Sequence, residues 1–397
     1  MRGRVCDLFA GSGTVSLALS SERPVVAADI QEYSRVLCTA LLNPCALDDA
    51  AVAALLEQIG ANQQHLQGCL EPILEAEQRA LAMATQQPTL LCDLVEAGPL
   101  LAQHDGRDTL AVALREVASR VHRQAGMAIT VQYFGGIYFS YRQALYIDSV
   151  LGAVAGMPPG ARETCLAALL STTSSLVNTV GKQFAQPMRP RRSDGTIKSH
   201  VIRQMCRDRT LDGRGTFLGW LSQYRALPRG GDHQVVRGDY REVLRELDNV
   251  SVIYADPPYT RDHYSRFYHV LETLCLRDYP DISKAWAGGR GPTSRGFYRI
   301  GRHQSPFCIK SQAPSAFAEL FKGARKVGVP LLVSYSPFVK NGRPRLLTVE
   351  GVSRIAEEYY RQVKVVAVGQ VTHSKLNRTE LSLAAAPCAE VFIVCRN

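Results

Sequence analysis

The sequence predicts an α/β fold in which a mainly parallel sheet is covered on both faces and is interrupted by a large helical segment. Apolar runs of strand length alternate with stretches of helical periodicity at both ends of the chain. This pattern is typical of strand–helix–strand units with a buried parallel sheet. Asp29 and Asp239 each follow such an apolar run and lie 210 positions apart. One strand–helix–strand unit needs only about 30 residues, so the excess predicts an insertion.

The predicted elements follow the chain in three groups. Residues 4–43 have the pattern strand, helix, strand, helix, and the segment that follows is mainly helical. Strand–helix units then resume with a strand that starts at residue 235. The later apolar runs predict strands at 250–255, 329–335, 363–368 and 389–395. We expect the last of these to pair antiparallel with residues 362–371 as a hairpin at the edge of the sheet.

These groups predict two domains. Residues 1–43 and 233–397 are expected to form the domain that carries the chemistry, and residues 44–232 form the helical insertion. The chain has 397 residues and 46% hydrophobic content, which is enough to bury a core in each domain.

The first predicted strand ends in a glycine turn. Gly11 and Gly13 lie between the apolar run that starts at Val5 and the next helix. Without a Cβ they permit a tight turn and a close approach of the backbone to a ligand. Asp29 ends the second strand, where a carboxylate can accept hydrogen bonds from ribose hydroxyls. The turn lacks the third glycine of the dinucleotide fingerprint, which disfavours NAD and FAD.

The tetrapeptide Asp256-Pro257-Pro258-Tyr259 follows the apolar run 250–255. Each proline restricts the residue before it to an extended conformation and has no N–H. The Pro257 carbonyl and the Asp256 carboxylate can therefore face one external amino group. Tyr259 offers a flat ring on which an extruded base can stack. This combination suits chemistry on the exocyclic amine of a planar base.

The ordered combination of glycine turn, strand-end acids and Asp-Pro-Pro-Tyr resembles the N(6)-adenine-specific DNA methyltransferases. This resemblance implies a Rossmann-like class I S-adenosylmethionine-dependent fold and methyl transfer to adenine in duplex DNA by base flipping, with no metal. The first strand, the glycine turn and the acids that follow later strands would bind the cofactor. In that resemblance the cofactor-binding residues are Asp7, Phe9, Ala10, Gly11, Ser12, Gly13, Asp29, Ile30, Asp239 and Tyr240, and the catalytic residues are Asp256, Pro257, Pro258 and Tyr259.

Each of these signals also has a purely structural interpretation. Asp-Pro-Pro-Tyr can form a plain turn after a strand, Asp29 can cap a helix, and Asp239 can cap the predicted helix 241–247. Other functions also remain open. They are methylation of the exocyclic amine of cytosine, methylation of an RNA base, and DNA binding by a degenerate cofactor fold without catalysis.

The charge is distributed unevenly along the chain. Residues 44–110 carry ten acidic residues and two basic ones, and such a face would repel a phosphate backbone. Residues 182–214 carry nine Lys or Arg against three Asp, and residues 284–310 carry six Lys or Arg and no acid. Two basic loop segments suit contact with nucleic acid, although solvated loops have the same composition. The candidate contacts are Lys182, Arg189, Arg191, Arg192, Lys198, Arg295 and Arg299.

The insertion is the predicted site of target recognition. Compact ribosomal-RNA methyltransferases with a similar motif carry no such insertion, whereas one type of adenine DNA methyltransferase does. We assign recognition to residues 111–232. Within it, the aromatic segment 131–141 either lines a base pocket or forms a bent strand that packs in a core. Helical spacing places Tyr264, Phe267, Tyr268 and Leu271 on one apolar face, and His263 and His269 are expected to be scaffold residues.

The composition predicts a cytoplasmic, nucleoid-associated protein. The 11 cysteines are scattered, without Cys-x-x-Cys pairs or zinc-ligand spacing, which is typical of reduced thiols. No apolar run reaches 18 residues, so we expect no membrane contact. The family normally has a helix and a glycine-containing motif before the first strand, and here that strand starts at residue 4. A partner could complete the cofactor pocket, and a restriction endonuclease could accompany the protein.

Overall fold

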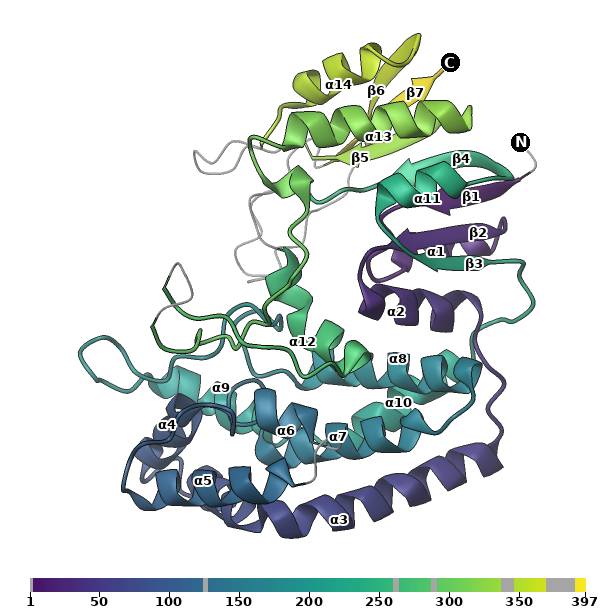
Figure 1. Ribbon diagram of the computed structural model, residues 1–397. Coiled ribbons are helices and arrows are strands. Elements are labelled where there is room, and N and C mark those ends of the chain that lie inside the picture. The colour runs from purple at the N-terminus through teal and green to yellow at the C-terminus, as the bar shows by residue number, and fades with distance from the viewer. Residues whose placement is uncertain (1–2, 124–127, 260–263, 287–290, 337–345, 369–389) are drawn as a thin grey trace. The chain divides into compact units, whose positions relative to one another are not determined.

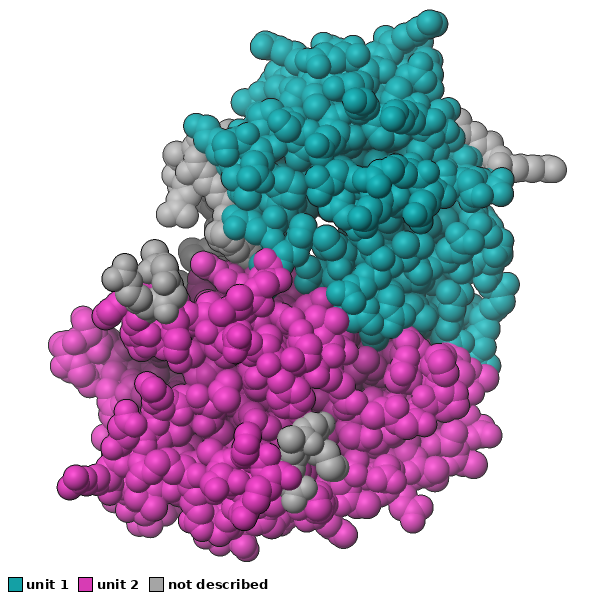
Figure 2. Space-filling view, viewed as in Figure 1, with its two compact units in different colours: residues 1–44, 227–265, 303–397 teal, residues 45–226, 266–302 magenta. Residues whose placement is uncertain are grey.

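The computed structural model describes residues 3–123, 128–259, 264–286, 291–336, 346–368 and 390–397. The chain divides into two compact units, which Figure 2 colours separately. The sheet unit comprises residues 1–44, 227–265 and 303–397, and the helical unit comprises residues 45–226 and 266–302. His263 and the loop 373–378 lie outside the described residues.

The sheet unit contains a seven-stranded sheet with the order β3-β2-β1-β4-β5-β7-β6 (Figure 1). All neighbouring strands pair in parallel except β7, which is antiparallel to both β5 and β6. The predicted α/β class and the antiparallel edge hairpin are confirmed, and the sheet is consistent with a Rossmann-like methyltransferase fold. The strands are β1 Arg4–Asp7, β2 Val25–Asp29, β3 Gln234–Arg237, β4 Val250–Ala255, β5 Leu331–Tyr335, β6 Gln362–Val368 and β7 Glu390–Arg396.

Helices cover both faces of the sheet because side chains alternate along each strand. On one face, Val26 and Ala28 of β2 join a core with α11, α13 and α14. On the other, Val25 and Ala27 pack with Cys38 and Leu42 of α2. The helices of this unit are α1 Thr14–Ser20, α2 Glu32–Leu42, α11 Tyr240–Glu246, α13 Ala313–Val327 and α14 Val349–Glu357, with a short 3-10 helix, Pro306–Cys308.

The long helix α3 runs along one edge of the helical unit and packs against α4, α5 and α7 (Figure 1). The Asp48 side chain caps its first turn by accepting the Ala51 N–H at 2.7 Å. Leu55, Ile59 and Leu66 are buried at helical spacing along one face. The helices here are α3 Asp49–Ala82, α4 Pro88–Ala97, α5 Thr109–His122, α6 Ile129–Tyr133, α7 Tyr141–Ala155, α8 Pro159–Leu176, α9 Ser199–Arg209 and α10 Gly213–Arg225. Helix α12, Tyr264–Leu276, begins in the residues of the sheet unit and continues in those of the helical unit.

The aromatic segment 131–141 belongs to the interior of the helical unit. Phe134, Tyr138 and Phe139 are buried, so packing in a core is the correct interpretation. The expected bent strand is wrong, because the segment begins in helix α6 and then turns at Gly136, which has φ of 76°. The buried Tyr138 hydroxyl lies 2.6 Å from the Phe184 carbonyl. The aromatic rings therefore fill the core rather than line an open surface.

Helix α12 differs in part from the expected apolar face. Leu271 is buried, Phe267 and Tyr268 are half-buried, and Tyr264 is exposed. His269 is buried, and its Nε2 lies 3.2 Å from the Phe184 carbonyl, as expected of a scaffold residue. Residues 266–302 pack with the helical unit, although they follow the Asp-Pro-Pro-Tyr segment in sequence.

No helix in the described ranges is both long enough and apolar enough to cross a membrane.

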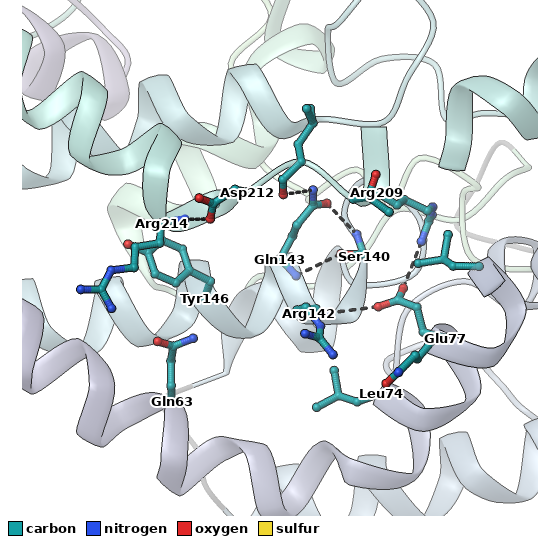
Figure 3. Close-up of a pocket in the computed structure, with 15 residues that line it drawn as sticks. Gln63, Leu74, Glu77, Ser140, Arg142, Gln143, Tyr146, Arg209, Asp212 and Arg214 are labelled. Carbon is teal, nitrogen blue, oxygen red and sulfur yellow. Dashed lines mark hydrogen bonds and ion pairs between the residues drawn. The ribbon is translucent and has the colours of Figure 1, made fainter. Parts of the chain in front are cut away.

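A buried ion pair joins two distant parts of the helical unit. Arg209 on α9 contacts the Glu77 carboxylate on α3 at 3.3 Å, and both side chains are almost fully buried. Arg209 also donates to the Gly136 carbonyl at 2.5 Å, while Glu77 accepts the Tyr141 N–H at 2.9 Å. Figure 3 shows the pair of Glu77 and Arg209 at the wall of a hollow of about 660 Å³. The paired charges and their hydrogen bonds hold α3, α7 and α9 together.

Replacing Arg209 with Ala should destabilise the protein by about 3–5 kcal/mol, because Glu77 would remain buried without its counter-charge. Denaturant unfolding followed by far-UV circular dichroism measures this loss. Arg207→Ala is the matched control, since Arg207 lies two residues away on the same helix and its side chain is 69% exposed. Equal unfolding free energies for the two variants would contradict the assignment.

Candidate active site at the carboxyl edge of the sheet

Three acidic residues lie where adjacent parallel strands end. Asp7 ends β1, Asp29 ends β2, and Asp256 directly follows β4. The strands β2, β1 and β4 are neighbours, and Asp7 is paired in register with Tyr254. In open α/β sheets this carboxyl edge is where ligands bind. The structure therefore brings together two predicted cofactor residues and the predicted catalytic aspartate.

The glycine turn closes over the end of β1. Gly11 and Gly13 have φ of 54° and 79°, in the left-handed region that favours glycine. A Cβ on Gly13 would lie 2.9 Å from Leu41 Cδ1 and 3.1 Å from Cys38 Sγ, whereas Gly11 has no such close neighbour. Gly13 therefore allows helix α1 to pack against α2, and Gly11 leaves space above the turn.

The other residues of the turn hold its shape. The Ala10 N–H donates to the Ala28 carbonyl at 2.9 Å, which ties the turn to β2. The Ser12 hydroxyl lies 3.0 Å from that of Thr14. The Phe9 ring lies 5.6 Å from the Tyr240 ring. These contacts place the backbone of the turn beside the carboxyl edge.

Asp7 is a buried carboxylate with one free oxygen. Its Oδ2 accepts the Ser16 hydroxyl at 2.7 Å, and its buried Oδ1 has no hydrogen-bond partner among the residues that the structure describes. Burial raises the pKa of Asp7 to about 6, and the nearby charge of Asp29 adds to the rise while Ser16 opposes it. An unpaired buried acceptor costs free energy unless a donor or a cation reaches it.

Asp29 holds the glycine turn from the tip of β2. Its carboxylate accepts the Gly11 N–H and the Gln31 N–H, each at 2.9 Å. Part of the residue is accessible, but protein surrounds the carboxyl group, and this burial raises its pKa. The next residue, Ile30, is half-buried and offers its carbonyl to Arg237 at 3.4 Å. Asp29 is thus oriented by backbone N–H donors of the glycine turn and of the start of helix α2.

Asp239 caps helix α11 through its side chain. It accepts the Arg241 N–H at 2.9 Å and the Arg241 Nε at 2.8 Å. Burial acts to raise the pKa of Asp239, but the hydrogen bonds and charge of Arg241 outweigh it and hold the pKa below its ordinary value. The Tyr240 hydroxyl donates to Glu319 at 3.2 Å. The capping interpretation therefore has direct contacts, and a role beside the cofactor stays a prediction.

The Asp-Pro-Pro-Tyr segment continues β4 beyond the sheet. Asp256 is exposed, Pro257 is buried, and the Pro258 carbonyl faces the Cys308 thiol at 3.5 Å. The half-buried Tyr259 ring lies 4.8 Å from the buried Tyr335 ring, at an interplanar angle of 51°. The core thus supports Tyr259 from one side, which fixes the ring without burying it completely.

The Asp256 carboxyl group lies near the carboxylates of Glu390 and Asp7, although the residue as a whole reaches solvent. Desolvation by its neighbours raises the pKa of Asp256 to about 7, and the charges of Glu390 and Asp7 contribute to the rise. A hydrogen bond with Ser334 acts in the opposite direction. Sequence reasoning missed Glu390 and Ser334, because neither belongs to a motif. Only their position could have identified them, since each lies at the end of its strand that reaches the carboxyl edge of the sheet.

The seven predicted nucleic-acid contacts all lie in the helical unit, and three of them already pair with carboxylates. Arg191 contacts Asp93 and Glu96, while Lys182 lies 3.4 Å from Asp208. Arg299 is buried and pairs with Asp278. Three of the other four donate hydrogen bonds within the protein: Arg192 to the Thr196 hydroxyl, Lys198 to the Arg189 carbonyl, and Arg295 to the Met188 carbonyl. The fourth, Arg189, is exposed.

A second basic group was not predicted. The guanidinium carbons of Arg266 and Arg302 lie 5.5 Å and 4.9 Å from the centre of the Tyr298 ring. The Nη1 of Arg302 is buried and has no hydrogen-bond partner within the described part of the chain. Burial lowers the pKa of Arg302, and the charge of Arg266 lowers it further. Two guanidinium groups on one ring, with no ion pair to a carboxylate among the described residues, form an anion-attracting cluster.

The chain is partly similar to two curated proteins, and no family model matches it. Modification methylase LlaI of Lactococcus lactis subsp. lactis is 34% identical over 105 residues, which are 26% of this chain and 15% of that protein. Type II methyltransferase M.FokI of Planomicrobium okeanokoites is 32% identical over 121 residues, which are 30% of this chain and 17% of that protein. The chain therefore spans less than a fifth of the length of these relatives. The similarity relates part of the chain to modification methyltransferases.

Proposed function

We propose that this chain is a methyltransferase that uses S-adenosylmethionine to modify the N(6) amine of adenine in duplex DNA. The observation that carries the proposal is the position of Asp256, which follows β4 on the same sheet edge as the glycine turn and Asp7. Partial similarity to modification methyltransferases supports the reaction class. The motif Asp-Pro-Pro-Tyr supports the choice of an exocyclic amine as the acceptor.

The residues at the sheet edge fit a cationic cofactor with a ribose. The unpartnered Oδ1 of Asp7 and the raised pKa values of Asp7 and Asp29 describe a site that is short of positive charge. Gly11 leaves open space above the turn, where a ligand can approach the backbone. S-adenosylmethionine supplies an electrophilic methyl group on a positively charged sulfur. Asp7 and Asp29 would hold its polar groups, with Asp239 and Tyr240 at the adjacent strand end.

Asp256 and the Pro257 carbonyl would orient the substrate amine. The lone pair of an adenine amine is delocalised into the ring, so the nitrogen is a poor nucleophile. Hydrogen bonds from both amine hydrogens to Asp256 and the Pro257 carbonyl would draw the nitrogen toward a tetrahedral shape and localise that lone pair. Tyr259 would stack on the extruded base, and Tyr335 holds the Tyr259 ring in place. Positioning and electrostatics then supply the catalysis, and the few kcal/mol spent on unstacking are offset by the new contacts.

The helical unit would supply recognition of DNA. Its residues between 111 and 232 remain the proposed target-recognition region, within an insertion in the catalytic domain. The proposed phosphate contacts are Arg189, Arg192, Lys198, Arg266 and Arg302. None of these side chains forms an ion pair with a carboxylate among the described residues. Cytosine is the alternative base, since the same acceptors and ring would serve its exocyclic amine. A cognate restriction endonuclease is a proposed partner, given the modification enzymes to which the chain is similar.

Asp256→Ala should reduce methyl transfer at least about 100-fold, because the amine loses the acceptor that prepares it for attack. Labelled methyl transfer to duplex DNA and to RNA, with digestion to nucleosides, measures the rate and identifies the base. Cofactor binding by calorimetry should change little. Glu357→Ala, on the exposed side of α14, is the control. Methylation within a few-fold of wild type would refute the role of Asp256, and label in cytosine or in RNA alone would replace the proposed substrate.

Arg266→Ala and Arg302→Ala should each weaken binding of duplex DNA and reduce its salt dependence. A lost phosphate contact lowers the slope of log K against log salt by about 0.9. Fluorescence anisotropy with a labelled duplex at several salt concentrations measures the slope. Arg79→Ala is the matched control, since Arg79 is an exposed arginine of the acidic helix α3. Slopes equal to that of the control would exclude these two arginines from the DNA interface.

A further inference from the structure

A buried serine lies between two carboxylates at the end of the sheet. The ladder of β4 and β5 pairs Ala255 with Val333, so Asp256 and Ser334 are the next residues on adjacent strands. The ladder of β5 and β7 pairs Tyr335 with Val391, which places Glu390 one step further on. Because side chains alternate with a period of two, these positions share one face of the sheet.

The contacts agree with this register. The Ser334 hydroxyl donates to Glu390 Oε1, and the Ser334 side chain is fully buried. The same hydroxyl is a hydrogen-bond partner of Asp256. A serine has one O–H hydrogen, so it can donate to only one of the two carboxylates at a time. Ser334 therefore connects Asp256, which reaches solvent and the substrate side, with the half-buried Glu390.

We propose that Ser334 and Glu390 carry away the proton that Asp256 receives from the substrate amine. This inference rests on the proposed function. Asp256 accepts the proton from the amine first, and Glu390 accepts it second. Ser334 is the bridge between Asp256 and Glu390.

The transfer balances without another reagent. When the amine nitrogen gains its methyl group it becomes cationic, and its N–H bond breaks as an O–H bond forms on Asp256. The Asp256 proton then moves to Ser334 Oγ while the original hydroxyl proton of Ser334 moves to Glu390. Asp256 is again an anion and Ser334 is again neutral, and Glu390 holds the proton. Glu390 is half-buried and can release it to water.

Other charged groups face Asp256 and must enter any account of its pH dependence. Asp7 on β1 and Glu390 on β7 raise the pKa of Asp256 through their charges. The Tyr254 hydroxyl, on the same strand, is also a partner of Ser334, and burial raises its pKa so that it stays neutral. Of these groups, Glu390 makes the larger charge contribution at Asp256 and contacts Ser334 directly.

The test compares Glu390→Gln and Ser334→Ala with Glu357→Gln, an exposed control on α14. Single-turnover methyl transfer is measured from roughly pH 5 to 9, because an ionised Asp256 is needed and its pKa of about 7 sets the acid limb. Glu390→Gln removes a negative neighbour and should move this limb to lower pH. Ser334→Ala removes a donor to the Asp256 carboxylate and should move it to higher pH. A mere loss of packing would not produce opposite shifts.

The proton leaves Asp256 only after the methyl group has moved, so the steady-state plateau rate over many turnovers, measured above the acid limb, reports this transfer. Each variant should lower it roughly tenfold, and the double variant should fall no further than the single ones, because both remove the same path. The proposal would be overturned if the acid limb of the pH–rate profile did not move in these variants, or if their plateau rates stayed within twofold of the control.

A readout without activity separates this inference from the proposed function. Infrared titration of the protein carrying ¹³C-labelled aspartate, with Asp256→Asn to identify the band, follows the protonated carboxyl of Asp256 directly. Its midpoint should fall in Glu390→Gln and rise in Ser334→Ala. A wild-type protein that transfers no methyl group would refute the proposed function. Midpoints that do not move would refute the coupling of Asp256 to Ser334 and Glu390, whatever the activity.

Discussion

The burial of several carboxylates at one edge of the sheet is the constraint on which the rest of the site depends. Asp7, Asp29 and Asp256 end neighbouring parallel strands, and Glu390 joins them from the antiparallel hairpin. Burial raises the pKa values of the first three, and like charges add to the rise at Asp7 and Asp256. Such a cluster lowers stability, and perturbed carboxylates at the mouth of an α/β sheet mark functional sites.

The surrounding packing holds this cluster in place. Apolar side chains of α11, α13 and α14 cover one face of the sheet, and those of α2 cover part of the other. The backbone supplies the remaining control, since the N–H groups of Gly11 and Gln31 orient Asp29 and the Ser16 hydroxyl orients one oxygen of Asp7. Rigid elements thus present the acids, while one oxygen of Asp7 remains without a partner for a ligand to satisfy.

The sequence predicted what is encoded locally. The glycine turn and the Asp-Pro-Pro-Tyr segment depend on adjacent residues, and both lie at the carboxyl edge as expected. The pairings of Arg191 with Asp93 and of Ser334 with Glu390 could not be predicted, because they join residues 98 and 56 positions apart. The expected bent strand at 131–141 failed because aromatic and β-branched residues also suit a buried short helix, and tertiary packing decided between them.

Binding of S-adenosylmethionine as a function of pH tests the central claim most directly. A cationic ligand favours ionised carboxylates, so its affinity should decline as the pH falls through the Asp7 pKa of about 6. Calorimetry in buffers of different ionisation enthalpy should then detect protons released on binding near that pH, and Asp7→Asn should abolish most of this release. An affinity that is constant from roughly pH 5 to 8, with no proton release, would contradict the account.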